Sequence, residues 1–116
     1  MTTALQPQNE RRIFERFSAR FPVKFKDARE DYGTDVFLRD ASAQGLRIMT
    51  KERYFLGDQL SLEVQLPDGG EPMVLNGEIV WVKIVNLTMW EIGVKFFEVN
   101  FLRMQRLFKL AEGLPL

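Results

Sequence analysis

The stretch DQLSLEVQLPDGGEPMVLNGEIVWVKIV, residues 58–85, contains two apolar segments separated by a turn. Apolar and polar residues alternate in the first segment, which is typical of a strand with one buried face. PDGGEP favours a tight turn because Asp and Gly adopt the dihedral angles that such turns need. MVLNGEIVWVKIV is rich in β-branched residues and predicts a long strand, with Asn76-Gly77 as a bend or bulge. The alternating apolar positions are Leu60, Leu62, Val64 and Leu66.

Further strand candidates lie on both sides of this stretch at close spacing. In FPVKF the apolar Val23 and Phe25 fall on one side, and Pro22 suits the first residue of a strand because its missing N–H does no harm there. Many strands with short connections predict an antiparallel barrel or sandwich. The other candidates are TDVFLRD (34–40), GLRIMT (45–50) and TMWEIGVKFFEV (88–99), the last as the partner of the long strand.

The last segment changes to a helical period. From Asn100 as N-cap, FLRMQRLFKL predicts a helix that Gly113 and Pro115 end. Leu102 and Leu110 lie beside its apolar stripe, where they either pack at the margin of the core or are exposed for a partner. The stripe itself is Phe101, Met104, Leu107, Phe108 and Ala111.

Length and composition bound the class of protein. At 116 residues the chain has the size of one domain, and we expect a flexible lead over 1–9 followed by a single domain over 10–112. Within it we expect an arginine-rich segment (10–20), a β-barrel (21–98) and a helix (100–112). Lacking cysteine and histidine, the sequence has no disulfide, no thiolate metal site, and no Ser–His or Cys–His pair. It also lacks a phosphate-binding glycine loop, so we expect no enzyme.

Charge and hydropathy limit the partners and the compartment. Formal net charge is zero, so there is no global field to attract nucleic acid or an anionic membrane. No apolar run approaches the ~20 residues that span a bilayer, and MTTALQPQNE lacks the features of a signal peptide. We therefore expect a cytoplasmic protein without metal or cofactor, and any recognition of anions must be local.

RRIFERF, residues 11–17, gathers Arg11, Arg12 and Arg16 around two phenylalanines. Such a run is either a solvated tail or a clamp for a phosphate, carboxylate or guanine edge, which the planar guanidinium suits. Arg12 and Arg16 are four residues apart, so one turn can aim both at the same object. Arg20 is close enough to Pro22 to belong to the first strand, and we place it outside the site or at its edge.

DASAQG, residues 40–45, is a second candidate. Asp40 and Ser42 either bind nearby backbone amides or present an acceptor and a hydroxyl outward. An outward aspartate can accept from the N1–H and N2–H₂ donors of guanine, and Gly45 would let the backbone approach the ligand. Trp81 and Trp90 remain open as well, because each is either a core residue or, for Trp81 above all, a platform on which a base stacks.

These two motifs resemble those of the PilZ domain family. RIFER matches its R-x-x-x-R pattern and DASAQG its [D/N]-x-S-x-x-G pattern, in the right order and about two dozen residues apart. FPVKF, IVWV and IGVKF also look like the framework of the family. The likeness covers roughly residues 10 to 110, and the two motifs together on a β-barrel pattern are a specific signal.

The resemblance implies a six-stranded antiparallel barrel, all-β with a C-terminal helix, that binds the bacterial second messenger cyclic di-GMP. Carried over by position, Arg12 and Arg16 would grip phosphates and the Hoogsteen edge of guanine, and Asp40, Ser42 and Gly45 would hold a guanine. Family members with an arginine at the position of Arg11 tend to bind a stacked pair of ligands, so two molecules per protomer are expected. An aromatic in the position of Trp81 stacks on guanine in some members.

Signalling by such a domain needs an effector protein as partner. We expect the arginine segment to become ordered around the ligand and so reshape the surface near the N-terminus, in a pathway such as motility or biofilm formation. Two alternatives remain: a ligand-independent adaptor of pilus, flagellar or exopolysaccharide machinery, and a barrel that binds single-stranded nucleic acid. The terminal helix is compatible with a monomer or a weak homodimer.

Overall fold

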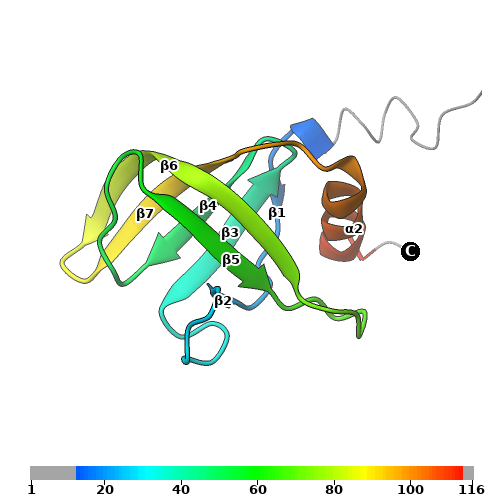
Figure 1. Ribbon diagram of the computed structural model, residues 1–116, viewed down its shortest axis with the longest axis horizontal. Coiled ribbons are helices and arrows are strands. Elements are labelled where there is room, and N and C mark those ends of the chain that lie inside the picture. Colours follow the sequence, from blue (N-terminus) through cyan, green and yellow to red (C-terminus); the bar gives the residue numbers. More distant parts are fainter. Residues whose placement is uncertain (1–12, 114–116) are drawn as a thin grey trace, which may run out of the picture.

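The computed structural model describes residues 13–113 as one curled antiparallel sheet with a helix beside it (Figure 1). Each strand pairs only with antiparallel neighbours, in the order β1-β3-β4-β7-β6-β5-β2. The helix, α2, lies at the end of the sheet near β1. The elements are β1 (Phe17–Ser18), β2 (Val23–Phe25), β3 (Val36–Ser42), β4 (Gly45–Thr50), β5 (Gln59–Val64), β6 (Met73–Asn86), β7 (Met89–Phe96) and α2 (Phe101–Ala111).

The sheet forms a partly open barrel with a C-terminal helix, so the predicted fold class is confirmed. Its curl brings the edge strand β2 back to β3, where Pro22 and Phe37 form an isolated antiparallel bridge. The strand count differs from the prediction, since there are seven strands rather than six. The additional strand is β1, where Phe17 pairs with Ala41 and Ser18 with Asp40. Part of the predicted arginine segment is therefore built into the sheet.

Alternation along the strands defines one continuous core. The apolar face predicted for residues 60–66 is buried, and the helix adds Met104, Leu107 and Phe108 to it. Burial of such side chains stabilises the fold by roughly 1.5–3 kcal/mol each. Besides the helix residues, the largest apolar side chains with no more than 1% exposure are Ile13, Leu46, Ile48, Leu62, Ile79, Ile92, Val23, Val36 and Val64.

The long strand β6 has its irregularity at a different place from the one predicted. Asn76-Gly77 lies in regular pairing, and the register shifts instead between Ile79 and Trp81. Gly77 serves a close approach rather than a bend, because a Cβ there would lie 2.4 Å from the carbonyl oxygen of Lys95 on β7. The bulge leaves both Val80 and Trp81 off the core face, a point on which the candidate site depends.

Helix α2 begins as predicted, with the Asn100 side chain accepting from the N–H of Arg103 at 3.0 Å. Phe108 packs edge-on against Phe17 of β1, with ring centroids 5.2 Å apart. Leu110 packs at the margin of the core, whereas Leu102 is exposed, so the margin interpretation is wrong for Leu102. Within residues 13–113, no helix has the length and apolarity that a bilayer crossing requires.

Candidate functional site

The two sequence motifs meet at the end of the sheet where β1 pairs with β3. The N–H of Ala43, in the turn after β3, donates to the carbonyl oxygen of Ile13 at 2.5 Å. A few residues further on, Arg16 Nη1 donates to Asp40 Oδ1 at 2.6 Å. These contacts join residues far apart in sequence, so the described part of the arginine segment lies on the DASAQG motif. Of the two alternatives for this run, the solvated tail does not describe Arg16, because its guanidinium is bonded to Asp40.

Asp40 belongs to a row of residues that crosses the outer face of the sheet. It pairs with Arg47 on β4, Arg47 with Gly93 on β7, and Gly93 with Trp81 on β6. Residues next to each other along a strand point to opposite faces, and the neighbours Leu46 and Ile48 are buried in the core. Arg47 and its row therefore face outward.

A second row runs beside the first. Ser42 pairs with Gly45 across the turn, and Gly45 pairs with Lys95 on β7. Between the two rows the surface is hollowed into a pocket of about 180 Å³. Its lining joins both motifs to the centre of the sheet: Arg16, Ser42, Gln44, Gly45, Leu46, Val80, Trp81, Gly93, Val94 and Lys95.

Two glycines give this surface its shape. A Cβ at Gly45 would lie 2.1 Å from the carbonyl oxygen of Val94, so β4 and β7 can approach only if residue 45 is glycine. Gly45 also lines the pocket, and its closeness to a ligand stays a prediction. A Cβ at Gly93 would lie 2.0 Å from Nε1 of Trp81. The indole therefore lies directly over Gly93, half-buried on the outer face rather than in the core.

The carboxylate of Asp40 is shared by two arginines. Arg16 holds Oδ1, and Arg47 Nη2 holds Oδ2 at 2.5 Å. Arg47 Nη1 also lies 3.8 Å from Oε1 of Glu91 on β7. The side chain of Asp40 is only 12% exposed, whereas those of Arg16 and Arg47 are 51% and 39% exposed. Ion pairing with both guanidiniums offsets part of the cost of burying this carboxylate.

Ser42 takes part in the turn that its residue type predicts. Its Oγ accepts a hydrogen bond from the N–H of Gln44 at 3.2 Å. That bond uses an acceptor lone pair of the hydroxyl, and the O–H is a separate donor. Ser42 is thus oriented by the local turn and also lines the pocket, so the two interpretations of DASAQG are compatible.

The structure brings most of the predicted site residues together. Arg16, Ser42, Gly45 and Trp81 line the pocket, and Asp40 joins it through Arg16. Arg11 and Arg12 lie outside the described residues. Sequence reasoning missed three outer-face residues, although alternation after a two-residue turn would place the first of them opposite Asp40. They are Arg47, Gly93 and Lys95.

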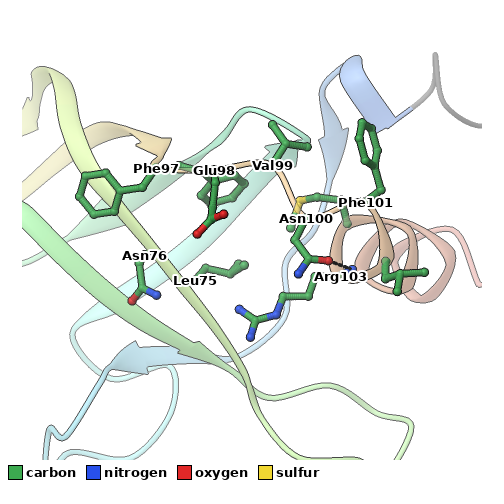
Figure 2. A pocket seen from close by; sticks show the side chains of 11 residues that line it. Leu75, Asn76, Phe97, Glu98, Val99, Asn100, Phe101 and Arg103 are labelled. Carbon is green, nitrogen blue, oxygen red and sulfur yellow. Dashed lines mark hydrogen bonds between the residues drawn. The ribbon is translucent and has the colours of Figure 1, made fainter.

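A larger hollow, of about 570 Å³, lies between β6 and the start of α2 (Figure 2). Two of its polar side chains already serve the fold, since Asn100 caps the helix and Arg103 Nη1 donates to the carbonyl oxygen of Val74 at 2.5 Å. Of the predicted site residues within 13–113, none lines it. Chemistry that suits an anionic nucleotide gathers at the smaller pocket, which we take as the candidate site.

Comparisons with known proteins identify the family. The model of the PilZ domain matches residues 10–113, and the chain belongs to the PilZ domain family. PilZ domains are non-enzymatic receptor and adaptor domains associated with cyclic di-GMP. Among solved structures, Bacillus subtilis Inhibitor of motility (MotI/DgrA) is similar in fold, with a TM-score of 0.56 and 16% sequence identity. The match covers 84% of this chain and 46% of that one. No curated protein sequence matches.

Proposed function

We propose that this domain is a receptor for cyclic di-GMP that passes the signal to a partner protein. Family membership supports the ligand class. The observation that carries the proposal is the contact between Arg16 and Asp40, because it joins the two motifs at the edge of one pocket on the outer face of the sheet. Guanine offers acceptors on one edge and donors on the other; Arg16 of the pocket suits the first, and the Asp40 carboxylate bonded to it suits the second.

Each side chain at the pocket has a chemical role in this proposal. Arg16 binds a phosphate or the O6 and N7 acceptors of guanine, and Asp40 accepts from N1–H and N2–H₂. Ser42 donates its O–H. Trp81 stacks on a base, a contact that contributes roughly 1–3 kcal/mol. Lys95 lines the same pocket and adds a second cation near the phosphates.

Binding requires a rearrangement, because Arg16 Nη1 and Asp40 Oδ1 are bonded to each other. Arg16 must leave the carboxylate when a phosphate takes its place. The segment that carries Arg16 packs on α2 through Phe17 on Phe108 and through Phe14 on Phe101, with centroids 5.2 and 5.9 Å apart. We propose that movement of this segment changes the surface at α2 and so controls a partner, in a pathway such as motility or biofilm formation.

Ligand stoichiometry is a separate part of the proposal. A stacked pair of cyclic di-GMP molecules brings four phosphates, and their repulsion needs more cations than one molecule does. Arg11 and Arg12 lie outside the described residues, but they are close to Arg16 in sequence. They could therefore supply the additional positive charges. We propose two ligands per protomer, with Arg11 needed for the second.

Calorimetric titration of the purified protein with cyclic di-GMP tests the function. We expect saturable binding with a stoichiometry near two, at least tenfold weakened in Arg16→Ala and in Asp40→Ala. Arg20→Ala removes the same charge outside the pocket and should bind as the wild type does. Arg11→Ala should lower the stoichiometry to one.

No binding by a wild-type protein that is folded by circular dichroism would refute the receptor function and leave a ligand-independent adaptor. Equal losses in Arg16→Ala and Arg20→Ala would show that only net charge matters. Steeply salt-dependent binding to random single-stranded oligonucleotides would instead indicate a nucleic-acid-binding barrel.

A further inference from the structure

We infer that Arg47 is a positioning residue for guanine recognition, holding the carboxylate of Asp40 in place while Arg16 exchanges onto the ligand. This inference rests on the proposed function. It concerns the selectivity of the same site for guanine. Arg47 lies outside both sequence motifs, and it reaches Asp40 from the neighbouring strand β4.

The two arginines that hold Asp40 differ in how firmly they are placed. Arg16 is the last residue before β1 and lies outside any strand, and its side chain is 51% exposed. Arg47 lies within β4, which is paired on both sides with β3 and β7. Its Nε is buried and has no hydrogen-bond partner in residues 13–113, so packing encloses the base of the guanidinium. Exchange onto a phosphate is therefore open to Arg16, whereas Arg47 stays.

Glu91 fixes the other side of the Arg47 guanidinium. Nη1 lies 3.8 Å from Glu91 Oε1, while Nη2 contacts Asp40. The side chain of Glu91 is 17% exposed. Beyond Arg47 in the row lies Gly93, which has no side chain, and the Trp81 indole occupies the space above it. The guanidinium is therefore held between two carboxylates on the outer face, close to the proposed stacking platform.

Electrostatics explains why the second arginine is needed. Guanine is neutral, so it does not replace the positive charge that leaves when Arg16 moves to a phosphate. The Asp40 side chain is 12% exposed, and a carboxylate so far from water is unfavourable without a counter-charge. Arg47 supplies that charge. Each carboxylate oxygen accepts more than one hydrogen bond, so Oδ2 can bind Arg47 and a guanine donor together.

A ligand pair that differs at one guanine donor tests the inference. Cyclic di-inosine monophosphate lacks the 2-amino group that Asp40 would accept from, so the wild type should bind it about tenfold or more weaker than cyclic di-GMP. Arg47→Met keeps the apolar stem of the side chain and removes the charge. We expect it to bind cyclic di-GMP at least tenfold weaker and to have lost most of the preference over the inosine analogue. Arg39→Met, one residue from Asp40, is the matched control and should retain both.

A double-mutant cycle separates positioning from direct contact. In an Asp40→Asn background, Arg47→Met should change the dissociation constant of cyclic di-GMP less than twofold, because Arg47 acts through the carboxylate. Undiminished selectivity in Arg47→Met would overturn the inference, and so would an equal loss in both backgrounds. Failure of the wild type to bind either ligand would refute the proposed function itself, and the inference with it. These results are distinct, since selectivity is measured only on a protein that binds.

Discussion

Replacing Gly93 by alanine should displace Trp81 and weaken ligand binding without unfolding the protein. An ideal Cβ at residue 93 would lie 2.0 Å from Nε1 and 2.3 Å from Cε2 of the indole. Carbon atoms pack at about 3.5–4.0 Å, so one of the two groups must move. The glycine lies within β7, paired on both sides, whereas the half-buried indole is on the outer face and borders solvent. The indole is therefore the group that moves.

The size of the effect follows from the proposed stacking. Loss of a base–aromatic contact worth roughly 1–3 kcal/mol raises a dissociation constant about 5- to 150-fold. In a Trp90→Phe background the fluorescence comes from Trp81 alone, so one sample reports both the environment of the indole and the binding of ligand. We expect Gly93→Ala to shift the emission maximum to longer wavelength and to raise the dissociation constant of cyclic di-GMP within that range.

Truncation of the tryptophan provides the control. In Trp81→Ala, the methyl group of Gly93→Ala has no indole to meet, so adding it should change the dissociation constant less than twofold. Unchanged emission and unchanged affinity in Gly93→Ala would refute the geometry. A further loss of affinity in the Trp81→Ala background would show that β7 itself had moved.

Two more predictions concern stability. Gly45→Ala brings a Cβ to 2.1 Å from the backbone oxygen of Val94, which cannot rotate away. In urea titration this variant should lower the free energy of unfolding by about 1–3 kcal/mol. An unfolding midpoint equal to that of the wild type would contradict this prediction. Arg106 donates two hydrogen bonds to Asp68, at 2.7 and 2.8 Å, and these lower the pKa of Asp68 from 3.8 to about 2. Because the folded pKa is the lower one, the stabilisation is complete above the unfolded pKa and is lost as the pH falls from about 4 through 2. Asp68→Asn should therefore lose less stability than the wild type as the pH falls from about 4 to 2. If the unfolding free energy falls with the same slope against pH in both proteins, the ion pair with Arg106 does not contribute to acid destabilisation.

Local patterns were sufficient to locate strands β2 to β7 and the helix. Alternation at residues 60–66 marks a buried face whatever the strand pairs with, because successive side chains point to opposite sides. Asn100 predicts the start of α2 because its side chain accepts a hydrogen bond from the backbone N–H of Arg103, three residues away. Interactions of this kind need only near neighbours in sequence.

The two-residue strand β1 was not predicted, because it depends on pairing with residues that are distant in sequence. Phe17 and Ser18 have no strand pattern of their own, and they are extended because Ala41 and Asp40 offer an edge to pair with. Pairing also explains the position of Arg16, which reaches Asp40 only after β1 joins β3. The residues of the two motifs could be chosen from sequence, while their contact could not.

Trp81 shows most clearly what the sequence determines and what only the tertiary structure decides. The sequence alone determined the fold class, the family resemblance and the identities of Arg16, Asp40 and Ser42 as candidates, since these depend on residue type and local spacing. Strict alternation from the buried Ile79 would place Trp81 in the core. A one-residue bulge between them reverses that orientation and puts the indole over Gly93, in one row with Arg47 and Asp40. Only the tertiary structure decides this, because register between distant strands is set by the packing of the whole sheet.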